Sequence, residues 1–441
     1  MAEGVFAPGH LGELTRIIPF ETVDAVLAEC GAAQRRLRKL PARVTVYLLL
    51  AAALFQDCGY LGVWSRLTAG LSGLPIPRIT ATALWHARTR LGVRPLQALF
   101  DLLRGPATAL RTGATCFAGM LVVAIDGTYL DVPEGPRTAT LGKGSNQYAT
   151  SGYPQICLSA LVACGTRAIL DAAFGSRERG ETHYARRLTR SIHPGMIVLL
   201  DRGFSGNDFL AHLAATRAAF LARFQANRKP VVLRRLPDGS FLSRFAALPV
   251  RVIECEFTIA TSAGRRTGIY RLATNLLDHR RYPAPDLITL YHQRWEIESA
   301  FFEIKKTLLG RRVLRARSLP GIAQEIYATL TAYQAIRIAM TDATDTHPGT
   351  DPDRASFTVA LHAARDQIIQ AQGVIAETVI DLVGAIGRAV LDQLMPTRRL
   401  RLSPRAVKRP MSRYAYKSLR VDRRTYQATL SMIILTGGPE P

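Results

Sequence analysis

Two short apolar runs, each followed directly by an aspartate, constrain the fold of this chain most. Leu121–Ile125 and Met196–Leu200 are continuous hydrophobic segments, as expected of strands that are buried on both faces of a sheet. Asp126 follows the first run and Asp201 the second, and each has a glycine within two residues. One aspartate at a strand end is structurally common, but ligands of open α/β sheets gather outside such ends. The pair therefore predicts a functional site at one edge of the sheet.

The segments around these two runs alternate between strand-like and helical patterns. Strands are predicted at Ile156–Cys164, Ala168–Phe174 and Ala219–Phe224, and helices at Glu181–Ser191 and Asn207–Ala218. The order along the chain is three strands, helix, strand, helix, strand. This order predicts an α/β fold with a mixed sheet and helices on its faces.

Hydrophobic patterning also predicts the domain organisation. Residues 1–112 are expected to form a helical, basic N-terminal domain that binds DNA, with helical oligomerisation as the alternative. The α/β domain covers 113–310 and contains an antiparallel β insertion at about 226–284. A helical C-terminal region follows at 311–395, and a basic tail at 396–441.

Within these regions the pattern places individual elements. Helices are predicted at Phe20–Leu40, Pro41–Phe55, Ala81–Leu103, Asp286–Leu309, Leu319–Thr341 and Phe357–Leu394. The insertion strands are predicted at Val231–Leu236, Ser240–Phe245, Val250–Ala260 and Thr267–Asn275. The first helix ends in a basic cluster that consists of Arg35, Arg36, Arg38 and Lys39.

The charge balance points to a polyanionic partner. Lysine and arginine total 57 against 34 aspartates and glutamates, which gives a formal net charge of +23. Such an imbalance favours nucleic acid. An arginine-rich genome is the alternative, but it does not account for the shortage of acids. The tail is the most basic segment, with tyrosines interleaved among its cations, and it either contacts DNA or is simply solvated: Arg398, Arg399, Arg401, Arg405, Lys408, Arg409, Arg413, Tyr414, Tyr416, Lys417, Arg420, Arg423, Arg424 and Tyr426.

Several function classes are disfavoured. The six cysteines form no CxxC pair and no Cys/His cluster, which argues against structural zinc and a disulfide framework. The longest apolar run, Val44–Phe55, is too short to span a bilayer, and no signal-type segment begins the chain, so an intracellular protein without a membrane partner is expected. No GxxxxGK[ST] loop is present, which disfavours an ATP-driven enzyme.

The predicted helix Asp286–Leu309 carries a polar stripe. At ~100° per residue, Tyr291, Arg294, Glu298 and Lys305 fall within about 60° of one another. Apolar residues flank this stripe on both sides: Ile288, Trp295, Phe302 and Leu309 on one, and Ile297, Phe301, Ile304 and Leu308 on the other. The stripe is therefore expected to face inward, where charge is costly unless it is paired or used.

The same geometry separates Glu298 from its acidic neighbours. Glu296 and Glu303 fall at about 120–140°, and are expected on the outward side as poor metal ligands. A buried Arg294–Glu298 ion pair is the structural alternative, but it leaves Tyr291 and Lys305 unexplained. Asp126, Asp201 and Glu298 together would suit hard divalent cations, and two such cations can cleave a phosphodiester.

Tyr291, Arg294, Glu298 and Lys305 form Y-x2-R-x3-E-x6-K, which resembles the signature of the DDE transposases of the insertion-sequence 4 family. Asp126 in IDGTYLDVP and Asp201 in LLDRGF resemble that family's catalytic aspartates. LPARVTVYLLLAAALF with ARTRLG is similar to its N-terminal domain, and FFEIKKTLLGRRVLRARSLPGIAQEIYATL to its post-catalytic helices. The resemblance covers roughly residues 10–340.

The resemblance implies an RNase H-like core, two-metal catalysis with Mg²⁺ or Mn²⁺, and cut-and-paste transposition. It implies that Asp126, Asp201 and Glu298 bind the metal ions. Arg294 and Lys305 would contact DNA phosphates, and Tyr291 would position a phosphate or the backbone of the DNA end. A homodimer on terminal inverted repeats and target DNA is also implied, in the cytoplasm of a bacterium and at its nucleoid.

One departure from the family pattern concerns tryptophan. Some relatives stack a flipped base on a tryptophan of the β insertion, whereas this chain has only Trp64, Trp85 and Trp295, all outside it. Tyr270 is a potential substitute. Two other functions remain as alternatives: a hydrolytic nuclease of the same fold that does not join strands, and a DNA-binding descendant that no longer catalyses.

Overall fold

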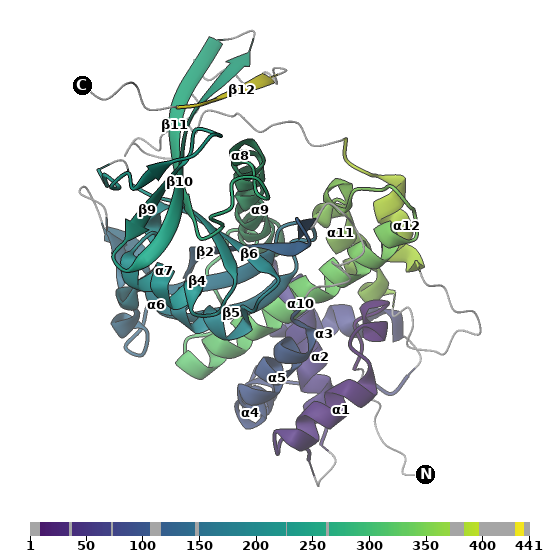
Figure 1. Cartoon of the computed structure of the whole chain (residues 1–441). Helices are drawn as coiled ribbons and strands as arrows, with labels where there is room; N and C mark the ends of the chain where they lie inside the picture. Colours follow the sequence, from purple (N-terminus) through teal and green to yellow (C-terminus); the bar gives the residue numbers. More distant parts are fainter. Residues whose placement is uncertain are drawn as a thin grey trace.

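The computed structural model describes residues 9–34, 38–71, 74–105, 116–145, 150–225, 227–261, 264–370, 383–396 and 428–435. A twisted sheet lies beside a body of helices drawn from both ends of the chain (Figure 1). Among the described helices, none is both long and apolar enough to cross a membrane.

Five strands form the centre of the sheet in the order β5-β4-β2-β6-β7: β5 (Ile169–Ser176), β4 (Thr150–Ala163), β2 (Met120–Asp131), β6 (Met196–Leu200) and β7 (Ala219–Arg223). The first three are antiparallel neighbours, whereas β2, β6 and β7 run parallel. Helix α6 (Glu181–Leu188) connects β5 to β6, and α7 (Asn207–Ala214) connects β6 to β7. This is the RNase H-like mixed sheet, and the predicted order of elements is confirmed.

Alternation along the strands explains why their apolar runs are unbroken. Val123 and Ile125 belong to one core cluster with α6 and α7, whereas Val122 and Ala124 belong to another, which includes the helices of both termini. Both faces of the sheet are covered, so consecutive residues are buried.

The predicted insertion is antiparallel, but it is not a separate layer. Its strands are β8 (Arg234–Arg235), β9 (Phe241–Phe245), β10 (Leu248–Thr261) and β11 (Gly264–Thr274). Since β11 pairs with β7, the insertion extends the central sheet. Part of the basic tail, β12 (Ala428–Ile434), pairs with β10 (Figure 1); the predicted tail cations and tyrosines lie outside the described residues. Two short strands, β1 (Cys116–Phe117) and β3 (Lys143–Ser145), pair with β2 and β4.

The N-terminal region is helical, as predicted, with one wrong boundary and one helix that was not predicted. Its helices are α1 (Phe20–Glu29), α2 (Ala42–Leu54), α3 (Tyr60–Thr68), α4 (Ala81–Leu91) and α5 (Arg94–Leu103). The prediction that the first helix reaches Leu40 is wrong, because Gly31 at φ +66° takes the chain out of the helix. Of the predicted basic cluster, Arg35 and Arg36 lie outside the described residues.

The C-terminal region consists of one long helix and two shorter helices that pack against it. They are α10 (Leu319–Asp345), α11 (Phe357–Ile369) and α12 (Gly384–Asp392), and residues 371–382 of the predicted last helix lie outside the described ranges. Helix α10 packs against α2 and α5 of the N-terminal region as well as against α11 and α12. Shorter helical turns are Leu14–Arg16, Ala69–Leu71, Ala139–Leu141, Arg177–Arg179, Thr189–Ser191, Arg202–Phe204 and Pro352–Arg354.

Candidate active site

Strand register brings the two predicted aspartates together. Ile125 of β2 pairs in parallel with Leu200, the last residue of β6, so Asp126 and Asp201 follow paired positions on neighbouring strands. The prediction that Asp126 stands at the end of its strand is wrong, because β2 continues to Asp131 with β4 as its antiparallel partner. The neighbouring strand β6 ends at Leu200, so Asp126 lies where β2 begins to extend beyond the end of β6.

The predicted helix Asp286–Leu309 packs against β2 and β6 at this point, but it is not uniformly α-helical. It consists of α8 (Ala284–Tyr291), a 3-10 turn (His292–Arg294), α9 (Trp295–Phe302) and a π-helical segment (Glu303–Leu308). The Tyr291 hydroxyl donates a hydrogen bond to the Leu200 carbonyl (3.1 Å), and Lys305 Nζ donates to Thr128 Oγ1 (3.1 Å). The helix is thus attached to both aspartate-bearing strands.

Arg294 supplies the positive charge among the three predicted carboxylates. Its Nη2 lies 3.0 Å from Glu298 Oε1, and its Nη1 lies 3.8 Å from Asp126 Oδ2. Burial disfavours the charged guanidinium, but Tyr291, Asp201 and the other two acids raise the pKa of Arg294 above its ordinary value. The Arg294–Glu298 ion pair of the structural alternative is therefore present, as one part of a larger cluster.

The pKa of the Asp126 carboxyl is strongly raised. Burial raises its pKa to about 7, although the Gly127 N–H donates to Oδ1 (2.8 Å) and Arg294 favours the charged form. Glu181, the first residue of α6, adds a repulsive charge that sequence reasoning did not single out. The glycine at position 127 allows the Glu181 side chain to lie close to β2, since a Cβ there would lie 2.6 Å from Glu181 Cγ.

The donor chemistry fits a divalent cation, which the resemblance to DDE transposases implies. All three groups are carboxylates, and Asp201 Oδ1 is buried without a hydrogen-bond partner in the described part of the chain. Within the described ranges, no three His, Cys, Asp or Glu side chains are grouped closely enough to hold a metal ion. In this arrangement Asp126 and Glu298 lie against Arg294 instead.

The prediction that Glu296 and Glu303 face outward is wrong. Both are buried, at 2% and 8% exposure, and they form ion pairs with Arg167 at 2.7 and 2.8 Å. Of the four residues predicted to flank the polar stripe on one side, Ile288 and Leu309 are buried, whereas Trp295 and Phe302 are 38% and 53% exposed. Within the stripe, Tyr291 and Arg294 are buried, whereas Glu298 and Lys305 are partly exposed.

Tyr270, the potential stacking residue of the insertion, is enclosed. Its ring packs against Tyr291, with ring centroids 5.8 Å apart, and it is 9% exposed. Arg223 lies over the same ring at 4.8 Å. Tyr270 therefore offers no open stacking face in this conformation.

Comparison with known families agrees with the geometry. Residues 8–101 match the family model described as the N-terminal part of insertion element 4 transposases, and residues 118–335 match the transposase DDE domain. The second match contains Asp126, Asp201 and Glu298.

Individual relatives are also transposases. The chain is 26% identical over 403 residues to the transposase InsG for insertion sequence element IS4 of Escherichia coli K12, which covers 88% of this chain and 90% of that protein. It is 26% identical over 199 residues to the putative transposase InsZ of the same organism, which covers 44% of this chain and 65% of that protein. A cryo-EM structure of a piggyBac transposase synaptic complex with hairpin DNA is 11% identical, with a TM-score of 0.43, and covers 88% of this chain and 84% of that chain. The two family matches place the chain among enzymes: it belongs to the DDE transposases of the insertion-sequence 4 family.

Proposed function

We propose that this transposase binds the terminal inverted repeats of its element, cuts the DNA there and joins the ends to target DNA. The observation that carries the proposal is the β2–β6 register, which aligns Asp126 with Asp201 beside the helix that bears Glu298. We propose that these three carboxylates hold divalent metal ions, Mg²⁺ or Mn²⁺. Two such ions would activate the attacking oxygen and stabilise the leaving one.

The cationic side chains of the helix have a separate role in this proposal. Arg294 is placed to exchange its carboxylate partners for a DNA phosphate, with which it can form bidentate hydrogen bonds. Lys305, at the edge of the same face, would contact a neighbouring phosphate. Tyr291 holds the helix against β6 through Leu200, so it would position the DNA backbone indirectly. Cut-and-paste excision by a homodimer on the two ends completes the proposal.

The test is cleavage and strand transfer on DNA that carries the element's own ends, with Mg²⁺ or Mn²⁺. Asp126→Ala, Asp201→Ala and Glu298→Ala should each reduce cleavage by roughly a thousandfold or more. DNA binding in EDTA should remain largely intact. Asp208→Ala, which removes an exposed carboxylate on α7, is the matched control and should cleave normally.

Each of the other outcomes would support a different function or a different role for the residue that is changed. Full activity in any of the three site variants would refute the assignment of that residue. Cleavage without joining would support the hydrolytic nuclease, and binding without any cleavage would support the descendant that no longer catalyses. Normal activity in Arg294→Ala would leave the Arg294–Glu298 contact as a purely structural ion pair.

A further inference from the structure

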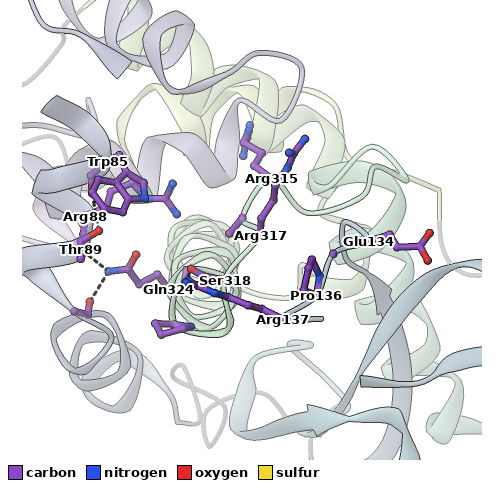
Figure 2. Close-up of a pocket in the computed structure, with 15 residues that line it drawn as sticks. Trp85, Arg88, Thr89, Glu134, Pro136, Arg137, Arg315, Arg317, Ser318 and Gln324 are labelled. Carbon is purple, nitrogen blue, oxygen red and sulfur yellow. Dashed lines mark hydrogen bonds between the residues drawn. The ribbon is translucent and has the colours of Figure 1, made fainter. Parts of the chain in front are cut away.

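A second basic feature lies away from the carboxylates, between the N-terminal helices and the start of α10. It is a cavity of about 830 Å³, and a neighbouring cavity of about 470 Å³ shares Trp85, Arg88 and Arg315 with it. Trp85 and Arg88 of α4 line one side, and Glu134 and Pro136 of the loop after β2 line the other (Figure 2). Arg315 and Arg317 lie between these two sides (Figure 2).

The charge of this cavity selects an anion. Four arginines line it, and its one acidic lining residue, Glu134, forms an ion pair with Lys143 at 2.7 Å. Arg315 is committed to the protein, because its guanidinium donates to the carbonyls of Ala52 and Cys58 and to the carboxylate of Glu325. Arg137 and Arg317 are exposed at the cavity and remain available for a ligand.

Arg88 is held in place with part of its hydrogen-bonding capacity unused. Its guanidinium lies 4.1 Å from the centre of the Tyr60 ring. Its Nε and the Tyr60 hydroxyl are both buried without a hydrogen-bond partner among the described residues. The backbone beneath is fixed, because Gln324 of α10 donates to the carbonyls of Arg88 and Gly92 at 2.8 and 2.6 Å (Figure 2). Buried polar groups normally have partners, so these two suggest a polar ligand.

Trp85 adds an aromatic surface to these cations. Its indole is 59% exposed at the cavity, and its only ring contact in the described structure is the edge of His86, at 4.7 Å. Exposed aromatic rings beside arginines are the combination that binds unpaired bases, since every base can stack and every phosphate can pair. The cavity volume lies within the range of sites that enclose a small organic group.

We propose that this cavity binds one unpaired nucleotide of the DNA, with its base against Trp85 and its phosphate between Arg317, Arg137 and Arg88. The inference rests on the proposed function for its source of DNA. It concerns a place other than the carboxylates, but the Glu134 side of the cavity continues β2, and Arg315 and Arg317 follow the helix that bears Glu298. Strand β2 leads from Asp126 into the loop with Glu134, and the Leu314 N–H bonds the Asp131 carbonyl at 3.0 Å. The cavity is therefore connected to the carboxylates through β2 and through the segment that follows the site helix.

The test measures binding of the full-length protein to a short single-stranded DNA that contains 2-aminopurine, in EDTA so that nothing is cleaved. Trp85→Ala should weaken binding roughly 5- to 100-fold and abolish quenching of the 2-aminopurine, whereas Trp85→Phe should restore most of both. Arg317→Ala should lower the slope of log K against log salt by about 0.7. Arg186→Ala, an exposed arginine on α6, is the matched control and should leave the slope unchanged.

Two results would overturn the inference. Trp85→Ala could bind and quench the probe as the native chain does, or Arg317→Ala could weaken binding no more than Arg186→Ala. Either result would assign the cavity to some other anion or to none. Cleavage of the element's ends is scored separately with the native chain, so failure of the cavity inference is distinguishable from failure of the proposed function.

Discussion

At the scale of single residues, Asp126 shows the free-energy cost of holding a charged carboxylate in this site. Its carboxyl is half-buried near Glu181 and Glu298, and its pKa is raised to about 7 although Arg294 lies 3.8 Å away. A carboxyl that only supported the fold would be expected to sit where its charge is stabilised. Asp126 is instead held in a place where the charged form is disfavoured until a cation arrives, as is typical of functional sites.

This shift has a defined effect on stability. The folded state retains the Asp126 proton between the ordinary carboxyl pKa and about pH 7, whereas the unfolded chain releases it. Stability should therefore fall as pH rises through that window. Asp126→Asn removes the titration and should raise the melting temperature above pH 7 in EDTA. For a chain of 441 residues, a gain of ~1 kcal/mol corresponds to roughly 1 °C.

Thermal melts between pH 4.5 and 8 check this prediction. The two melting curves should converge at the acidic end, where Asp126 is protonated, and separate as pH rises. Adding Mg²⁺ should then stabilise the native chain more than Asp126→Asn, because only the native chain keeps the full set of ligands. Parallel pH profiles for the two proteins would contradict the assigned environment of Asp126.

At the scale of elements, the sequence predicted strands better than it predicted helix faces. The runs before Asp126 and Asp201 were identifiable because burial on both sides of a sheet requires uninterrupted apolar residues. The end of β2 was misplaced because pairing with β4 continues through the polar positions beyond Asp126. The prediction that Glu296 and Glu303 are exposed is wrong for two reasons. A uniform step of ~100° per residue ignores the 3-10 and π-helical turns of this helix. The hydrophobic pattern of one helix also does not reveal a buried cation elsewhere in the chain.

That buried cation is Arg167, in the turn between β4 and β5. It pairs with Glu296 and Glu303 on the site helix, and with Asp353 at 2.9 Å. Arg337 of α10 also pairs with Glu303. The network fixes the back of the site helix to both the sheet and α10, which keeps Arg294 and Glu298 aligned with the strands on its other side.

Removing Arg167 should therefore destabilise the protein strongly. Arg167→Ala leaves buried carboxylates without their partner, and should lower the free energy of unfolding by ~3–5 kcal/mol. Arg167 has φ +56°, so Arg167→Gly removes the same ion pairs but relieves a left-handed backbone; it should be less destabilised than Arg167→Ala by roughly 1 kcal/mol. Urea unfolding measures both, and exposed Arg186→Ala should change stability by less than ~0.5 kcal/mol. Equal stabilities for Arg167→Ala and Arg186→Ala would disprove the role of the network.

At the scale of the whole molecule, α10 joins regions that the sequence alone separates. It contacts α2 and α5 of the N-terminal region, and its residue Gln334 accepts a hydrogen bond from the Ile169 N–H of the sheet (2.9 Å). Arg315, just before α10, bonds the carbonyls of Ala52 and Cys58 at 3.1 Å each. The predicted domain boundary at residue 112 therefore does not separate two hydrophobic cores, because one core cluster contains residues from both sides of it. Such sharing is invisible to local pattern, because periodicity shows which face is apolar but not what covers it.

The charge of the whole chain leads to the last prediction. Eleven arginines and lysines between Arg398 and Arg424 contribute to the net charge of +23, and we expect them to bind DNA phosphates without sequence preference. A chain that ends at residue 396 should bind random duplex DNA more weakly, and the slope of log K against log salt should fall by up to ~0.9 for each phosphate that the tail no longer neutralises. This truncation also removes β12, so a variant that replaces the eleven cations with glutamine and keeps β12 separates the charge from the strand. An unchanged salt slope in both proteins would show that the tail is solvated, and that the basic surfaces of the folded part, including Arg137 and Arg317, provide the affinity for DNA.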